Sequence, residues 1–271
     1  PEGMSFSIQG KTAVVTGAAN GVGLAIARHF ADKGANVVFA DMDEKRLDNE
    51  LGEIGDESNV RMFAGDLRQK LTIANLLSAT LDAFERVDIL VNGSRQMLAA
   101  DPLNPDDDAV KALLDQNLMT SLRLTQLFAR RMIKQARDEG KEEGPVGSVI
   151  NLSSIAAQRT HPKLLAYSVS SAALDQLTRS MAVALAPERI RVNAVAFGSV
   201  MSASLQGALK EDGDIREKII DHTPLSRIAS AGELAEVAQF LASDGSGFMT
   251  GQILTVDGGR TLIDAVDTPA H

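Results

Sequence analysis

Seven short apolar runs recur along the chain, and stretches with helical periodicity separate them. The runs span residues 13–15, 36–40, 60–64, 87–91, 148–152, 191–196 and 253–256. Such runs between helical stretches are typical of strands that are buried on both faces of a parallel sheet. The alternation continues from end to end without a linker or a repeat. It therefore predicts a single α/β domain, in which helices cover both faces of a doubly wound, seven-stranded parallel sheet.

Two of the helical stretches have a definable apolar side. Residues 71–84 carry apolar side chains at helical spacing at Leu71, Ala74, Leu77 and Leu81. This spacing is typical of an amphipathic helix. A second helix carries Val110, Leu113, Leu114 and Leu118 on one side, and Asn117 falls on that same side. A polar group there needs a partner, so Asn117 either bonds to backbone or belongs to a site.

Composition excludes several classes of function. The 271 residues include 27 Lys and Arg, 36 Asp and Glu, one Tyr, no Trp and no Cys, and the net charge is −9. An acidic chain without a basic stripe is not expected to bind nucleic acid, and without cysteine it has no disulfides or thiolate chemistry. No apolar run approaches the roughly 18 residues of a membrane span, and no signal-peptide pattern is present, so a cytoplasmic location is expected. No metal site is expected.

The start of the chain carries one further expectation. Pro1 to Gly3 precede Met4 and are interpreted as a cloning remnant, which leaves residues 4–271 as the domain.

A glycine-rich turn follows the first apolar run and leads into an amphipathic stretch, residues 24–30. The turn contains Gly17, Asn20, Gly21, Val22 and Gly23. Glycines let the backbone pass close to a pyrophosphate, and the first turn of the following helix offers free N–H groups and the positive end of its dipole. The pattern favours an anion site, although a tight strand-to-helix turn without a ligand has the same spacing.

Asp41 ends the second apolar run, 18 residues after Gly23. A carboxylate at this distance can accept hydrogen bonds from a ribose 2′-hydroxyl, and it repels a 2′-phosphate. Neither Met42 nor Asn20 offers a positive charge for such a phosphate. A Rossmann-like domain that binds NAD rather than NADP is predicted. The alternative is that Asp41 caps the turn before Glu44.

Further polar residues follow the fifth apolar run. Ser153 and Ser154 stand where a doubly wound sheet presents its ligands, although serines are also common in turns. Tyr167 is 13 residues beyond Ser154, near the start of the helical stretch 164–186, and Ser171 is one turn further on the same face.

Together these residues resemble the short-chain dehydrogenase/reductase family from Gly10 to Gly259. The resemblance extends to Asp66-Leu67, Gly198-Ser199-Val200, Thr250-Gly251-Gln252 and Val256-Asp257-Gly258-Gly259. It implies an NAD(H)-dependent oxidoreductase that transfers hydride between nicotinamide and a small-molecule secondary alcohol or ketone.

The resemblance also implies roles for single residues. Tyr167 would be the general acid/base, Ser154 would stabilise the reacting oxygen, and Asn117 would anchor a proton-relay water. Asp66 would face adenine, and Val200 with Ser202 would hold the carboxamide and phosphate side of the cofactor. The remaining residues implied at the cofactor are Leu67, Asn92, Gly93 and Gly198.

Three departures from the family pattern surround the nicotinamide half. Ser171 stands where the family has a lysine that binds ribose and helps the tyrosine to ionise. The family's Asn-Asn-Ala-Gly reads Asn92-Gly93-Ser94-Arg95, and its Pro-Gly reads Phe197-Gly198. Either Arg95 or Lys163 replaces the missing ammonium, or the protein is a catalytically impaired NAD-binding pseudoenzyme that works as a sensor or partner subunit.

Two helical regions remain. Residues 199–228 correspond to the family's substrate lid, whose apolar residues suit a partly hydrophobic substrate or simply pack on the core: Met201, Leu205, Leu209, Ile215, Ile219 and Ile220. The Tyr167 helix is apolar on more than one side, through Leu174, Leu177, Met181, Val183 and Leu185. This predicts a subunit interface, and the resemblance points to a homotetramer or homodimer.

Overall fold

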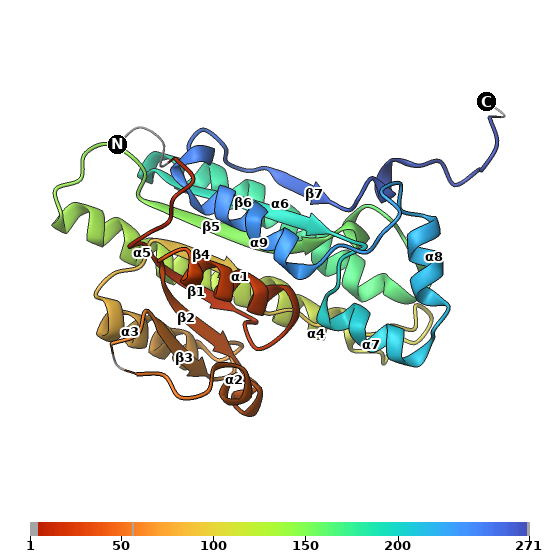
Figure 1. Ribbon diagram of the computed structural model, residues 1–271, viewed down its shortest axis with the longest axis horizontal. Coiled ribbons are helices and arrows are strands. Elements are labelled where there is room, and N and C mark those ends of the chain that lie inside the picture. The colour runs from red at the N-terminus through yellow and green to blue at the C-terminus, as the bar shows by residue number, and fades with distance from the viewer. Residues whose placement is uncertain (1–4, 56, 270–271) are drawn as a thin grey trace.

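A parallel sheet runs through the whole molecule (Figure 1). The computed structural model describes residues 5–55 and 57–269, so the interpretation of residues 1–3 lies outside the described residues. All seven predicted strands are present: β1 Thr12–Thr16, β2 Asn36–Asp41, β3 Val60–Ala64, β4 Ile89–Asn92, β5 Gly147–Ser154, β6 Ile190–Phe197 and β7 Ile253–Val256. Their order is β3-β2-β1-β4-β5-β6-β7, and every pairing is parallel. The predicted doubly wound α/β fold is confirmed.

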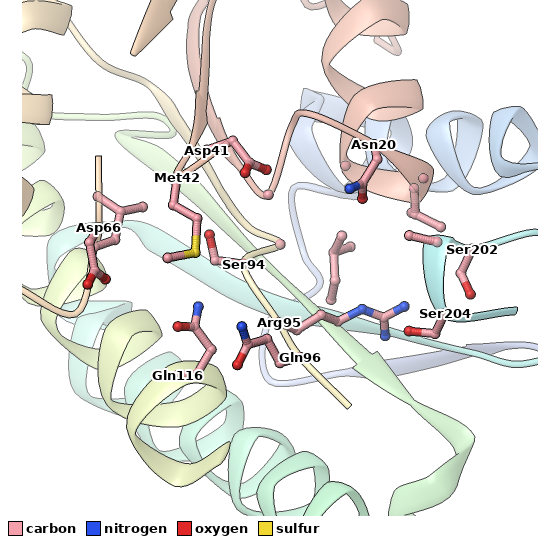
Figure 2. A pocket seen from close by; sticks show the side chains of 18 of the residues that line it. Asn20, Asp41, Met42, Asp66, Ser94, Arg95, Gln96, Gln116, Ser202 and Ser204 are labelled. Carbon is pink, nitrogen blue, oxygen red and sulfur yellow. The ribbon is translucent and has the colours of Figure 1, made fainter. Parts of the chain in front are cut away.

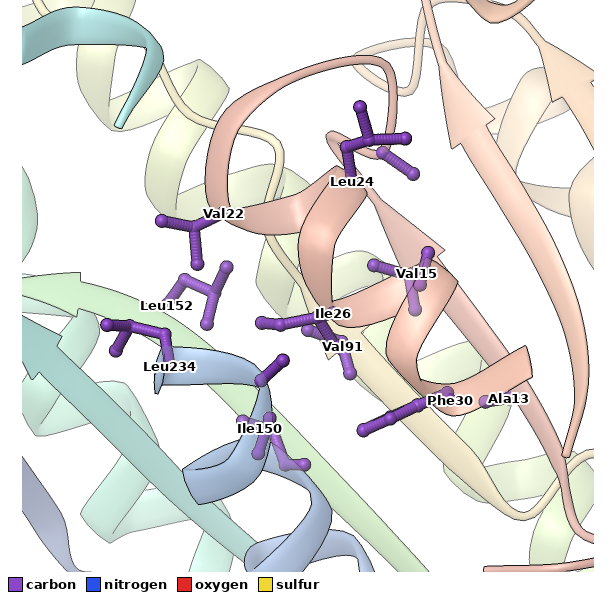
Figure 3. Close-up of a cluster of buried hydrophobic side chains, with 14 of the residues drawn as sticks. Ala13, Val15, Val22, Leu24, Ile26, Phe30, Val91, Ile150, Leu152 and Leu234 are labelled. Carbon is purple, nitrogen blue, oxygen red and sulfur yellow. The ribbon is translucent and has the colours of Figure 1, made fainter. Parts of the chain in front are cut away.

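Helices cover both faces of this sheet. One layer contains α1 (Gly21–Asp32), α2 (Glu44–Leu51) and α9 (Ala231–Ala242), and the other contains α3 (Lys70–Phe84), α5 (Thr120–Asp138) and α6 (Leu165–Leu185). Successive strand residues point to opposite faces. Val15 of β1 therefore joins Ile26 and Phe30 of α1 in one core cluster (Figure 3), whereas its neighbour Val14 joins Phe128 of α5 in the other. Two cores thus hold the sheet rigid from both sides.

The predicted helix is present as α3, and only some of its regularly spaced apolar residues are buried. Leu71 is 72% exposed and Ala74 is exposed, while Ile73, Leu76 and Thr80 are buried. Apolar residues occupy two overlapping stripes of this helix, so spacing alone does not decide which stripe faces the sheet. The larger Ile73 and Leu76 pack inward, and the Thr80 hydroxyl is satisfied by the Leu76 carbonyl at 2.8 Å.

The remaining helices lie toward the carboxyl ends of the strands. There α7 (Ala203–Glu211) and α8 (Ile215–Asp221) form the region predicted as a lid (Figure 1). A short helix, α4 (Ala109–Leu113), continues through a π-helical stretch, Leu114–Met119, into α5. Single 3-10 turns cover Ile155–Ala157, Pro162–Leu164, Ala186–Glu188, Asp244–Ser246 and Arg260–Leu262.

Only part of the apolar surface of α6 is left uncovered within one chain. Leu174 is buried, and Met181 and Leu185 pack against the core beneath the helix. Val183 remains 77% exposed. The outward side also carries the polar residues Gln176 and Arg179, which are exposed. The predicted subunit interface at this helix stays a prediction.

Candidate active site

The carboxyl ends of β1 and β4 mark the point where the chain winds in opposite directions. β1 neighbours β2 on one side, whereas β4 neighbours β5 on the other. A crevice opens at such a point in doubly wound sheets. Here the Thr16 hydroxyl accepts hydrogen bonds from the backbone N–H groups of Gly93 and Ser94, at 3.0 and 3.2 Å. The two strand ends are therefore fixed to one another.

The glycine-rich turn is packed so closely that side chains are excluded. Gly17 has φ +67°, and a Cβ on it would lie 2.3 Å from the Gly93 carbonyl oxygen. A Cβ on Gly23 would lie 2.2 Å from the Gly17 carbonyl oxygen. Asn20, which precedes α1, makes no side-chain cap bond to the helix. The first turn of α1 thus presents its N–H groups toward the crevice, as an anion site requires.

A first pocket of about 210 Å³ lies over this turn (Figure 2). Ten of the residues predicted to bind the cofactor line it: Gly17, Asn20, Gly21, Val22, Gly23, Asp41, Asp66, Leu67, Gly93 and Ser202. Gly198 and Val200 line a second pocket instead. The Asn92 amide faces the interior, where it donates to Asn151 Oδ1 at 2.8 Å and to Thr125 Oγ1 at 3.2 Å.

The first pocket fits the adenosine and pyrophosphate half of a dinucleotide. Asp41 is held by the N–H groups of Ala19 and Asp43, at 3.1 and 2.9 Å, which leaves its remaining lone pairs for ribose hydroxyls. Gln116 lines the same pocket, and its Oε1 is buried without a hydrogen-bond partner among the described residues. An amino group such as that of adenine would satisfy this acceptor.

Asp66 stands at the far side of this pocket (Figure 2) and forms a fork-like pair with Arg68. The hydrogen bonds from the Arg68 guanidinium, both 2.9 Å long, are the main cause that lowers the pKa of the Asp66 carboxyl. Asp66 is therefore an ionised acceptor at neutral pH.

The second pocket, of about 400 Å³, contains the other predicted site residues. Ser154 ends β5, and Tyr167 lies in the first turn of α6; both line the pocket and are nearly buried. The Ser154 hydroxyl accepts the N–H of Ala156 at 3.0 Å, which fixes its position. Ser171 lies one turn after Tyr167, buried behind the pocket lining.

Arg95 forms the wall between the two pockets. It lines both of them together with Ser202 and Ser204, toward which its side chain extends in Figure 2. Its guanidinium donates a hydrogen bond to the Tyr167 phenolic oxygen at 2.8 Å and to the Ser153 carbonyl at 3.4 Å. Lys163, the other candidate for a replacement cation, is exposed and does not line the pocket. Geometry thus singles out Arg95 as the cation next to Tyr167.

Asn117 fixes the backbone next to Arg95. Its Oδ1 accepts the Gln96 N–H at 2.8 Å, and its Nδ2 donates to the Gln96 carbonyl at 2.9 Å. Both Asn117 and Gln116 lie in the π-helical stretch, and both are buried. π-Helical turns often mark functional sites. The amide of Asn117 therefore holds the segment that carries Arg95.

Several lining residues were not found from the sequence. The sequence does contain an indication for Gln116, because it is a second polar residue beside Asn117 in the same apolar stretch. Arg159 and Arg260 line the second pocket, yet no pattern connects two positions so far apart in the chain. The Arg159 guanidinium donates to the Thr261 carbonyl, which brings these two segments together.

Residues 5–55 and 57–269 contain no group of three or more His, Cys, Asp or Glu side chains that could hold a metal ion. Within the same ranges, no helix has both the length and the apolar character needed to cross a bilayer.

The chain is similar to known proteins over almost its full length. A family model described as "Enoyl-(Acyl carrier protein) reductase" matches residues 17–261. The 3-oxoacyl-[acyl-carrier-protein] reductase of Thermotoga maritima is 32% identical over 94% of this chain and 99% of that protein. The 7alpha-hydroxysteroid dehydrogenase of Escherichia coli K12 is 30% identical over 94% and 96%. A solved 7 alpha-hydroxysteroid dehydrogenase, complexed with NADH and 7-oxo glycochenodeoxycholic acid, superposes with a TM-score of 0.84 at 29% identity, covering 94% and 96%.

Proposed function

The chain belongs to the short-chain dehydrogenase/reductase family, and on that premise we propose that it is an NAD(H)-dependent oxidoreductase that interconverts a secondary alcohol and its ketone. The observation that carries this proposal is the hydrogen bond from Arg95 to the Tyr167 phenolic oxygen, beside Ser154 in one pocket. Arg95 thereby supplies the positive charge that the serine at position 171 lacks.

The residues of the second pocket divide the work as follows. Tyr167 is the general acid/base: its phenolic oxygen takes the proton from the substrate hydroxyl during oxidation and returns it during reduction. Arg95 places a positive charge and a hydrogen bond on the phenolic oxygen, where negative charge develops during proton transfer. Ser154 donates a hydrogen bond to the substrate oxygen. The bound nicotinamide supplies the hydride acceptor or donor in this chemistry.

The cofactor side of the proposal rests on the first pocket. The glycine turn holds the pyrophosphate, Asp41 the adenosine ribose, and Gln116 with Asp66 the adenine. Since Asp41 would meet a 2′-phosphate with a fixed negative charge, NAD is favoured over NADP. Gly198, Val200 and Ser202 complete the nicotinamide side, and Ser171 and Asn117 act from behind its lining, Asn117 by holding the segment that carries Arg95.

We propose further that residues 199–228 form a substrate lid and that the protein assembles as a homo-oligomer. Residues 199–228 supply Leu205, Ala208 and Ile219 to the second pocket, which supports a lid over a partly apolar substrate. The exposed Leu165, Val169 and Val183 of α6 support pairing with a second copy, as a homodimer or homotetramer. Size-exclusion chromatography with light scattering tests the latter, and a monomer at micromolar concentration contradicts it.

Steady-state kinetics on a panel of secondary alcohols and ketones tests the function. The wild-type protein should form or consume NADH with part of the panel. Arg95→Met should lower kcat about 10²- to 10³-fold, because the phenolic oxygen of Tyr167 loses the cation and the hydrogen bond beside it. Combining Arg95→Gly with Ser171→Lys should restore at least a tenth of kcat, since the cation then returns from α6. Lys163→Met is the matched control and should leave kcat unchanged.

Two results would contradict the proposal. If Arg95→Met turns over like wild type, Arg95 has no part in the chemistry. If calorimetry shows NAD binding but no panel member reacts, the wall formed by Arg95 closes the nicotinamide side, and a pseudoenzyme that senses NAD or serves as a partner subunit is the better description.

A further inference from the structure

Positive charge gathers in the second pocket. Three arginines line it, namely Arg95, Arg159 and Arg260, while none of its described lining residues is Asp or Glu. The whole chain has a net charge of −9, so this distribution runs against the overall balance. A concave site of one sign attracts ligands of the opposite sign.

Arg95 is already engaged, but Arg159 and Arg260 are available for a ligand. Arg159 follows the turn Ile155–Ala157, and Arg260 begins the turn Arg260–Leu262 after β7. Arg159 donates to the Thr261 carbonyl, which places it against the neighbour of Arg260, and from its other terminal nitrogen to the Gln158 carbonyl at 3.3 Å, so only its remaining N–H groups are left for a ligand. Within residues 5–55 and 57–269, no hydrogen bond or ion pair holds the Arg260 guanidinium.

The carboxylate of Asp257 lies near Arg260, and both of its oxygens are occupied. Asp257 Oδ1 accepts the Gly259 N–H at 2.9 Å, and Asp257 Oδ2 accepts the Thr261 N–H at 2.8 Å. Asp257 is buried and does not line the pocket. It shapes the turn that begins with Arg260, and its carboxylate, which accepts two backbone N–H groups, forms no hydrogen bond or ion pair with the Arg260 guanidinium among the described residues.

Arg260 also lies on the lid side of the pocket. It lines an adjoining cavity of about 200 Å³ together with Ile215, Lys218, Ile219 and His222 from α8 and its end. Arg260 does not line the first pocket, which lies over the glycine-rich turn. The positive charge of Arg260 is therefore separate from the proposed pyrophosphate site.

The rest of the second pocket is apolar. Its uncharged walls include Met97, Ile155, Leu164, Leu205, Ala208 and Ile219. A volume of about 400 Å³ falls in the range of small-molecule sites. A ligand that fills this space has an apolar body and an end group that meets the two arginines.

We propose that the substrate is an alcohol or ketone whose apolar body ends in an anionic group, a carboxylate or phosphate, bound by Arg260 and Arg159. This inference rests on the proposed function, because the reacting carbon is placed at Tyr167. Guanidinium groups pair with both anions through two parallel hydrogen bonds, and such pairs strengthen in a partly buried site. The anionic end also selects the orientation of the substrate, with the reacting oxygen at Tyr167 and Ser154.

Calorimetric binding without NAD separates this inference from turnover. The probes are levulinate, 6-oxoheptanoate and 9-oxodecanoate, their methyl esters, and a keto-alkyl phosphate of matching length. At least one acid should bind tenfold or more tightly than its ester. Arg260→Gln should weaken that acid about tenfold and leave the ester unchanged. Arg216→Gln removes an exposed charge from α8 outside the pocket lining and should change neither.

Charge reversal gives a second test that requires gained binding. Arg260→Glu should bind a keto-amine of the same chain length more tightly than wild type does, which a misfolded protein cannot do. The phosphate probe binding tenfold tighter than every acid supports the inference and identifies phosphate as the end group. Equal binding of each acid and its ester by the wild-type protein overturns it.

The outcomes also distinguish the two proposals. Binding of the acid that depends on Arg260, without any NADH-linked turnover, supports the anion site and contradicts the oxidoreductase proposal. Turnover that is equally fast with neutral and anionic ketones supports the oxidoreductase and overturns the anion site.

Discussion

Arg95 stacks on Phe197, with its guanidinium carbon 4.2 Å from the centre of the ring. One follows β4 and the other ends β6, and the resemblance of the sequence to the family implies a departure at both positions. The ring supports one face of the guanidinium while its nitrogen donates to Tyr167. The two departures are thus one local arrangement, in which the aromatic residue holds the cation in place.

Replacing Phe197 by leucine should therefore lower kcat. A cation–π contact of this kind contributes about 0.5–2 kcal/mol, which corresponds to about a 2- to 30-fold decrease if Arg95 loses its position. KM for NAD should change less than kcat, because the first pocket does not include Phe197. Phe197→Tyr keeps a ring and should retain most activity. Equal losses in both variants would assign the ring a packing role only.

Gly17→Ala should destabilise the protein more than Gly10→Ala does. Both glycines have positive φ, +67° and +77°, so each alanine carries a backbone cost of about 1–2 kcal/mol. At Gly10 nothing lies within 4 Å of the new Cβ, whereas at Gly17 it overlaps the Gly93 backbone. The overlap should add about 1–3 kcal/mol.

Urea unfolding of the two variants gives this difference directly. Because Gly93 precedes Ser94 and Arg95, the shift at Gly17 should also lower kcat, while Gly10→Ala should not. Identical unfolding free energies for the two alanine variants would contradict the close packing of the turn.

Asp41→Ser should reduce the preference for NAD over NADP. Two like charges placed together cost on the order of a few kcal/mol, so the ratio of kcat/KM values for the two cofactors should fall about 10- to 100-fold. Asp43→Asn is the matched control, since Asp43 caps α2 through the Arg46 N–H at 3.0 Å. The control should alter stability by about 1 kcal/mol or less and leave the ratio unchanged. An unaltered ratio in Asp41→Ser would place the discrimination elsewhere.

Asp175 predicts a pH dependence of stability. Burial is the main cause that raises the pKa of this carboxyl, against the hydrogen bond that Ser153 Oγ donates at 2.6 Å. The folded state therefore holds the proton more tightly than the unfolded state does. Stability from this group is present below the unfolded pKa of about 3.9 and is lost as pH rises through the folded value.

Asp175→Asn should remove this loss, so the variant should be more stable than wild type at neutral pH and gain no advantage in strong acid. Chemical denaturation across pH 3 to 8 provides the comparison. Asp82→Asn changes an exposed carboxyl on α3 and serves as control. A wild-type advantage at neutral pH would show that the ionised Asp175 stabilises the fold.

The sheet and the first pocket could be predicted because local sequence determines them. Buried parallel strands require consecutive apolar residues, and the anion turn requires glycines where a Cβ would overlap backbone, as at Gly17 and Gly23. In α3, by contrast, two apolar stripes were available, and only tertiary packing selected Ile73 and Leu76 over Leu71.

The wall formed by Arg95 and the proposed anion site of Arg159 and Arg260 depend on the direction in which these long side chains extend. Nothing periodic follows Asn92, so the sequence could name Arg95 as one of two candidates but could not decide between it and Lys163. Arg159 and Arg260 come together through a bond to a backbone carbonyl, which any residue at position 261 could supply. Contacts of this kind leave no pattern in a single sequence.

Tyr167 is the chain's one tyrosine, and the chain has no tryptophan. Near-ultraviolet absorption beyond that of phenylalanine thus comes from a single phenol, which is hydrogen-bonded to Arg95 and lines the second pocket. A ligand that displaces Arg95 or replaces water near this ring changes the spectrum of the unlabelled protein. The molecule carries its own optical reporter at the one position where ligand, guanidinium and phenol meet.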